Sequence, residues 1–165
     1  MDSARYHTRR AEIETYFDRT AAATWETLTS DAPVSRIRRT VRKGRDEMRD
    51  TLLSWLPEDL TGARLLDAGC GTGTLAIEAA RRGAEVVAID LSPTLVNIAR
   101  ERLLDLNATL AVSFRVGDMR DMDLGRFDYA VAMDSLIHYD VSDGVQTLAA
   151  MAAEIETKIV FTFAP

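Results

Sequence analysis

The chain has 165 residues, of which 47% are hydrophobic and 28% charged, as expected for one globular domain with a substantial core. Its net charge of −6 argues against a general nucleic-acid binder, and no apolar run approaches the roughly 20 residues that a membrane helix needs. The single cysteine excludes an internal disulfide and a cysteine-rich metal site, and we expect no bound metal. Because no apolar signal core follows Met1, the sequence predicts a cytoplasmic protein.

The charge is unevenly distributed along the chain. Met1 to Leu60 carry eleven acids and eleven bases, whereas Thr61 to Pro165 carry fifteen acids and nine bases. We therefore predict two parts: an N-terminal helical arm over residues 1–60 and an α/β domain over residues 61–165.

The arm is predicted to contain two helices. The first spans Met1 to about Asp31 and presents Ile13, Tyr16 and Phe17 on one apolar face. After the break at Pro33, a longer helix spans Val34 to Leu56. One face of this second helix carries four arginines, Arg38, Arg42, Arg45 and Arg49.

Two interpretations of this arginine face stay open. It can be a solvated helix surface, stabilised by pairs such as Arg42 with Asp46 that contribute a few tenths of a kcal/mol each. It can instead bind an anion, because guanidinium groups hold carboxylates in bidentate fashion.

A glycine-rich loop follows the first apolar run of the second part. The segment from Arg64 to Asp67 reads as a strand, and Gly69, Gly71 and Gly73 precede a run of helix-forming residues. Thr74 stands where a dinucleotide fingerprint needs its third glycine, and no Gly-Lys-Ser/Thr follows. A carboxylate two residues before the loop would repel a diphosphate and attract a cation. The alternatives are a cation-binding loop or a glycine turn whose acid caps the next helix.

Strands and helices then alternate, which favours a doubly wound parallel sheet with right-handed crossovers. We predict a Rossmann-like sheet of five strands in the order 3-2-1-4-5, with helices on both faces. The predicted strands are 64–67, 85–90, 111–116, 129–133 and 159–163; the helices between them end at Gly83, run from Pro93 to about Leu104, and run from Ser142 to Glu156.

An aspartate stands at or just past the end of each of the first four strands. Because the carboxyl ends of parallel strands share one edge, Asp67, Asp90, Asp118 and Asp134 are predicted to line one ligand site. Such an acidic edge suits a cationic ligand that is rich in hydrogen-bond donors. S-adenosylmethionine (SAM), with its ammonium, sulfonium, ribose diol and adenine amine, is a ligand of this kind.

The loop and the acid before it resemble the first motif of the class I SAM-dependent methyltransferases. In that class the acid at the end of strand two holds the ribose hydroxyls, and we assign this role to Asp90. Asp118 and Met119 are assigned to binding of the adenine. Asp67 is assigned to the methionine ammonium, and Met133 with Asp134 to the neighbourhood of the methyl group. The full predicted cofactor set is Asp67, Gly69, Cys70, Gly71, Gly73, Asp90, Leu91, Asp118, Met119, Met133 and Asp134. Cys70 is expected to be a small turn residue, not a nucleophile.

Several segments together resemble the magnesium protoporphyrin IX O-methyltransferase family of chlorophyll and bacteriochlorophyll biosynthesis. They are the Tyr16–Thr20 stretch with Trp25, the Val41–Arg45 stretch, the glycine loop, the Val116–Met119 stretch, and Ala132 to Tyr139. The resemblance implies methylation of the ring C propionate of magnesium protoporphyrin IX, with SAM as the donor. It also implies contact with a magnesium chelatase subunit and peripheral association with the inner or photosynthetic membrane.

Candidate residues for the acceptor side follow from this resemblance. His138 and Tyr16 are predicted to be catalytic, with His138 orienting the reacting carboxylate or approaching the magnesium. The arginine face, Arg38, Arg42, Arg45 and Arg49, is predicted to bind the substrate's second propionate. Since class members carry two strands after the fifth, we also expect that this chain lacks a C-terminal part and that its fifth strand has an unpaired edge.

Three other functions are compatible with parts of the pattern. The chain can be a SAM methyltransferase for another small acid, amine or quinone, or a non-catalytic SAM-binding module. A nicotinamide oxidoreductase is the third, although Thr74 argues against it.

Overall fold

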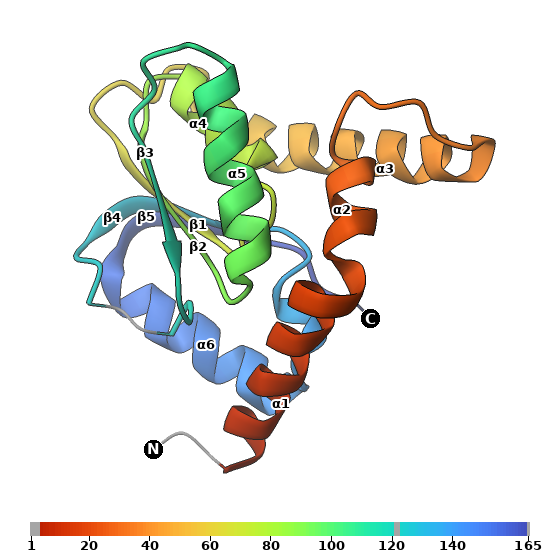
Figure 1. The fold of residues 1–165 in the computed structure, drawn as a ribbon. Helices are drawn as coiled ribbons and strands as arrows, with labels where there is room; N and C mark the ends of the chain where they lie inside the picture. The colour runs from red at the N-terminus through yellow and green to blue at the C-terminus, as the bar shows by residue number, and fades with distance from the viewer. Residues whose placement is uncertain (1–3, 121–122, 165) are drawn as a thin grey trace.

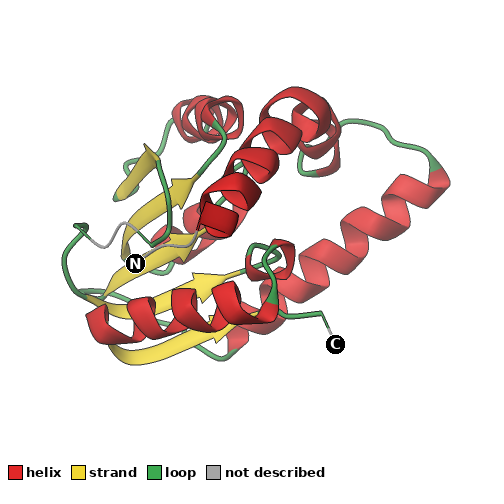
Figure 2. Ribbon diagram, turned by 90° about the horizontal axis from the view of Figure 1, so that it is seen from below, coloured by secondary structure: helices red, strands yellow, loops and turns green. Residues whose placement is uncertain are grey.

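A parallel five-stranded sheet forms the centre of the computed structural model, which describes residues 4–120 and 123–164 (Figures 1 and 2). The strand order is β3-β2-β1-β4-β5, which confirms the predicted order 3-2-1-4-5. The strands are β1 (Arg64–Ala68), β2 (Glu85–Asp90), β3 (Val112–Val116), β4 (Phe127–Ala132) and β5 (Ile155–Phe161). Every neighbouring pair is parallel.

Helices cover both faces of the sheet and bury both faces of its central strands. α4 (Thr74–Arg81), α5 (Pro93–Asp105) and the second half of α3 (Arg36–Ser54) contribute to the core on one face, and α6 (Val141–Glu154) covers the other (Figure 2). Successive residues of β1 alternate between these cores, so that Leu65 packs into the first and Leu66 into the second. Asp67 follows on the same side of β1 as Leu65, and its carboxylate accepts a backbone hydrogen bond from Ala76 in α4.

The last helix and strand differ from the prediction. β5 begins at Ile155, four residues before the predicted start, and ends at Phe161, so α6 passes into it without a loop. Pairing of Ile155 with Phe127 on β4 extends the strand through the polar segment 156–158. This segment lacks an apolar pattern, and only its position beside β4 makes it a strand.

The N-terminal arm crosses the carboxyl ends of the strands as a broken helix, where one continuous helix was predicted. Its parts are α1 (Ala4–Thr15), a π-helical segment η1 (Tyr16–Ala21) and α2 (Ala22–Leu28), followed by a turn into α3 (Figure 1). The predicted start at Met1 lies outside the described residues. π-helical turns are rare and often occur at functional sites. The division of the chain at residue 60 stays a prediction.

None of the helices among residues 4–120 and 123–164 is long and apolar enough to cross a membrane.

Candidate functional site

The glycine loop lies between β1 and α4 and owes its shape to two glycines in particular. Gly69 has a φ of 84°, and a Cβ there would lie 2.3 Å from the Cβ of Ser135, a residue that follows β4. A Cβ on Gly71, whose φ is 52°, would meet no atom of the described residues within 4 Å. The first glycine therefore allows close packing of two loops, and Gly71 leaves the main chain open toward the cavity.

Asp67 is the most deeply buried acid of the site. Its side chain lies at the cavity wall with Oδ2 accepting no hydrogen bond from any described residue. Burial, followed by the nearby charge of Asp90, raises the pKa of Asp67 to about 7. A buried carboxylate oxygen without a donor is costly, so a cationic N–H group from a ligand would complete this position.

Asp90, at the end of β2, faces the same cavity but is held by the backbone. Its Oδ2 accepts the Gly71 N–H at 2.8 Å and its Oδ1 accepts the Ser92 N–H at 2.9 Å. Burial raises the pKa of Asp90, and these N–H groups oppose that shift. Each carboxylate oxygen keeps further lone pairs that can accept a ligand hydroxyl.

The other two strand-end acids are engaged by the arm and by α3. Asp118, predicted to face adenine, does not line the cavity; it accepts the Tyr6 hydroxyl at 2.8 and 2.9 Å and lies 3.5 Å from Arg10. Asp134 lines the cavity and accepts Arg45 Nη1 at 2.6 Å. Its φ of 53° lies in the left-handed region, which aspartate adopts more readily than most residues other than glycine.

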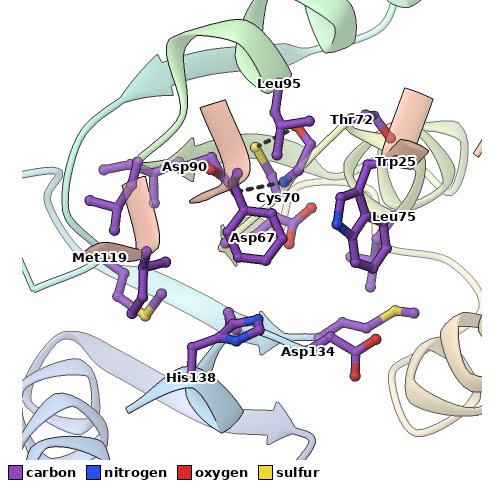
Figure 3. A pocket seen from close by; sticks show the side chains of 18 of the residues that line it. Trp25, Asp67, Cys70, Thr72, Leu75, Asp90, Leu95, Met119, Asp134 and His138 are labelled. Atoms are coloured by element: carbon purple, nitrogen blue, oxygen red, sulfur yellow. Dashed lines mark hydrogen bonds between the residues drawn. The ribbon is translucent and has the colours of Figure 1, made fainter. Parts of the chain in front are cut away.

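The acidic edge predicted from four aspartates is therefore reduced to two that have no basic partner among the described residues, Asp67 and Asp90. They stand together on one side of the cavity, while Asp134 and His138 stand on the other (Figure 3).

The four arginines of α3 have different environments. Arg45 lines the cavity, with its guanidinium 4.0 Å above the Trp25 ring.

The other three arginines of α3 do not line the cavity. Arg42 donates to the carbonyls of Thr27, Leu28 and Ala32 and so holds the turn between α2 and α3. Arg49 pairs with Asp46 and Asp50, and Arg38 is exposed. The structure thus brings one member of the predicted arginine set to the cavity.

His138 and Tyr16, the predicted catalytic pair, both contact the Phe17 ring. His138 lines the cavity and meets the Phe17 ring edge-on at 5.0 Å between centroids. Tyr16 packs edge-on against the Phe17 ring at 5.1 Å between centroids, is 53% exposed and is not among the cavity-lining residues. Burial and then the charge of Arg9 lower the pKa of His138, which therefore presents a neutral imidazole at pH 7.

The cavity wall combines predicted residues with residues that the sequence analysis missed. Predicted cofactor residues that line it are Asp67, Gly69, Cys70, Gly71, Asp90, Leu91, Met119, Met133 and Asp134; Gly73 lies outside it with Asp118. Burial raises the pKa of Cys70, so its thiol stays protonated, as a turn residue's would.

Four wall residues precede α3: Ile13 in α1, Phe17 in η1, Trp25 in α2, and Thr29 just after α2. The spacing of Ile13 and Phe17 marked an apolar helix face, but that pattern does not say whether such a face covers a core or a ligand.

Polar contacts tie the arm to the sheet at several points above the cavity. Tyr6 donates its hydroxyl to Asp118, and Asp18 accepts a hydrogen bond from Ser92 at the start of α5. Thr29, just after α2, accepts hydrogen bonds from Thr72 and Arg102, both at 2.7 Å. The arm therefore closes the cavity as a cover.

The fold and the glycine loop define a class I methyltransferase domain, and the family described as Methyltransferase domain matches residues 65–156. The Magnesium-protoporphyrin O-methyltransferase of Rhodobacter capsulatus is 54% identical over 94% of this chain and 70% of its own length. The corresponding protein of Synechocystis sp. is 28% identical over 93% of this chain and 67% of its own length.

Solved structures agree with this match. The crystal structure of magnesium protoporphyrin IX methyltransferase from Synechocystis PCC 6803 with bound SAM superposes with a TM-score of 0.89. That comparison covers 95% of this chain and 76% of the other, at 27% identity. The chain belongs to the magnesium-protoporphyrin O-methyltransferase family.

Proposed function

We propose that this chain transfers the methyl group of SAM to the ring C propionate of magnesium protoporphyrin IX, forming the monomethyl ester and S-adenosylhomocysteine. Family membership supports the reaction. The observation that supports the proposal most directly is that one cavity holds both groups needed. The buried Asp67 Oδ2 has no hydrogen-bond partner among the described residues, and the Arg45 guanidinium stacks on Trp25. The first suits the donor's ammonium, and the second suits the acceptor's carboxylate.

The residues present fit SAM at the donor side of the cavity. Asp67 would accept the ammonium, the free lone pairs of Asp90 would accept the ribose hydroxyls, and Met119 and Leu91 would offer apolar contacts to the adenine. Asp118 accepts the Tyr6 hydroxyl and so holds the arm beside this side of the cavity.

The chemistry needs little proton transfer. Bound SAM supplies a methyl group on a sulfonium, and a carboxylate oxygen forms the new O–CH₃ bond as the S–CH₃ bond breaks. Since a propionate is already ionised at neutral pH, the protein's task is to hold it in line. Such positioning can contribute about 7–11 kcal/mol.

Arg45 and the aromatic cover are suited to that task. Of the Arg45 guanidinium, Nη1 is engaged by Asp134, and its other N–H groups have no hydrogen-bond partner among the described residues. We infer that these groups bind a propionate of the substrate. Phe17 and Trp25 exclude water from the reacting atoms.

Incubation of the chain with labelled SAM and magnesium protoporphyrin IX tests the assignment. We expect a labelled monomethyl ester with this substrate and far less product with a porphyrin of the same ring that lacks propionates. If S-adenosylhomocysteine binds but no ester forms, the substrate assignment is wrong. If S-adenosylhomocysteine does not bind, the assignment of SAM as the donor is wrong too.

Alanine at His138 or Tyr16 should reduce methyl transfer without reducing affinity for S-adenosylhomocysteine. We expect the His138→Ala variant to lose about 10- to 100-fold in kcat, because a slightly misplaced carboxylate reacts that much more slowly. Tyr16, exposed beside Phe17, is expected to contact the macrocycle, so Tyr16→Ala should raise KM for the porphyrin about tenfold.

The other histidine provides the matched control for this prediction. His7 is exposed, and His7→Ala should leave both kinetic constants within about twofold of the wild-type values. An unchanged kcat in the His138 variant would contradict the proposed role of that residue.

Association with a magnesium chelatase subunit or with a membrane surface rests on the family resemblance alone. Both stay predictions for this chain.

A further inference from the structure

Asp18 joins the arm to the first turn of α5. Its Oδ1 accepts the Ser92 hydroxyl at 3.0 Å and the Thr94 N–H at 2.9 Å. Ser92 is itself the N-cap of α5 and accepts the Leu95 N–H at 3.2 Å. The N–H groups of Thr94 and Leu95, which have no partner within the helix, are therefore capped by two side chains, one of which belongs to the arm.

The same contact leads directly into the donor side of the cavity. Ser92 donates its hydroxyl to Asp18 and its backbone N–H to Asp90, which in turn accepts the Gly71 N–H. One continuous set of hydrogen bonds thus runs from the arm through the loop after β2 to the glycine loop. Movement of the arm at Asp18 would change the surroundings of Asp90.

The residue before Asp18 is part of the cavity wall. Phe17 meets His138 at 5.0 Å and Trp25 at 6.0 Å between ring centroids. Phe17 and Asp18 are neighbours in η1. Because the backbone of one helical turn is rigid, holding Asp18 on α5 sets where Phe17 enters the cavity. The π-helical turn allows the two side chains to reach these different partners.

We propose that Asp18 is a positioning residue that holds the arm closed over the methyl-donor site and fixes Phe17 and Asp90 in their binding positions. The identity of the ligand rests on the proposed function, whereas closure of the arm does not. Hydrogen bonds from Thr94 and Ser92 lower the pKa of Asp18, so the carboxylate is ionised at neutral pH and accepts strongly.

Two measurements on Asp18 variants test this role. Amide hydrogen exchange in the arm, residues 4–28, is compared without ligand, and the Kd for S-adenosylhomocysteine is measured by calorimetry. For Asp18→Ala we expect about tenfold faster exchange in the arm and about tenfold weaker binding, with exchange in β1 and β4 unchanged.

Two further variants separate the contact from charge and from general destabilisation. Asp18→Asn keeps an oxygen acceptor for Ser92 and Thr94, so both effects should fall to about threefold or less. Asp31→Ala removes an exposed acid from the turn that follows the arm and should match the wild type in both measurements.

Unchanged arm exchange in Asp18→Ala, or unchanged affinity in that variant, overturns the proposal. So does an equal increase in exchange across β1 and β4, because that would show global destabilisation. If the wild-type chain itself fails to bind S-adenosylhomocysteine, the donor assignment fails instead, and arm exchange alone decides the role of Asp18.

Discussion

Replacing Asp67 with asparagine is expected to weaken binding of S-adenosylhomocysteine by at least about 100-fold. The substitution keeps the shape of the side chain but removes the charge that faces the ligand's ammonium inside a buried site. Loss of one partner of a buried charge pair costs roughly 3–5 kcal/mol, and 2.7 kcal/mol is already about 100-fold in Kd. Calorimetry measures the change directly.

A second acid offers the control for this variant. Asp128 lies at the start of β4, away from the cavity, and accepts the Arg64 N–H at 2.8 Å. An asparagine there keeps the acceptor, so affinity should stay within about twofold of the wild type. Equal affinities for the Asp67 and Asp128 variants would contradict the role of Asp67.

The same variant has an expected pH signature in the unliganded protein. The pKa of Asp67 is raised to about 7 by burial, above its ordinary value of 3.8, so the folded state binds more protons than the unfolded state between these values. Wild-type stability must then decrease as pH rises from about 4 to 7. Asp67→Asn lacks this titration and should be more stable than wild type above pH 7, by roughly 1–4 kcal/mol.

Urea unfolding at pH 5 and pH 8 measures this difference. Binding should show the complementary dependence, because the ligand requires an ionised Asp67. Wild-type affinity is expected to fall about tenfold per pH unit below pH 7. A flat affinity between pH 5 and pH 8 would contradict the raised pKa.

Arg45→Ala is expected to reduce kcat/KM for magnesium protoporphyrin IX at least about 100-fold while the Kd for S-adenosylhomocysteine stays within about threefold. Arg45 faces the cavity on the Trp25 ring, and its loss removes the group that we propose for the substrate's carboxylate. Arg45→Lys should recover only part of the rate, because an ammonium lacks the planar fork that binds a carboxylate in bidentate fashion.

The exposed member of the same helix face provides the comparison. Arg38→Ala removes an equal charge from α3 and should leave kcat/KM within about twofold of the wild type. Steady-state kinetics with varied porphyrin, at saturating SAM, distinguish the two variants. Similar losses for both would support the carboxylate-binding face predicted from the sequence over a single residue at the cavity.

The sheet could be predicted from the sequence because its signals are local. Short apolar runs, a glycine C-cap at Gly83 and a Ser-Pro start at Ser92 mark the ends of successive elements. Strands alternate with helices except between β3 and β4, and this pattern permits few topologies. The same locality placed the glycine loop and four aspartates at strand ends. Their association with a cationic methyl donor followed from charge and from the resemblance to known methyltransferases.

Contacts between distant parts of the chain were not accessible to this reasoning. Gly69 is packed against Ser135, Asp118 is held by Tyr6, and Asp18 caps a helix that begins at Pro93; each pair is more than 60 positions apart. Helical periodicity identifies which residues share a face, but it does not specify what that face will meet.

The sequence by itself determined the parallel sheet, its strand order, the glycine loop and the family to which the chain belongs. The tertiary structure decided which of the marked residues share a cavity: Asp67, Asp90, Asp134, Arg45 and His138 meet there, whereas Arg42 and Asp118 hold other parts of the fold. The physical reason is that strand and turn propensities act within a few residues, while the cavity exists only once the arm has packed across the ends of the strands.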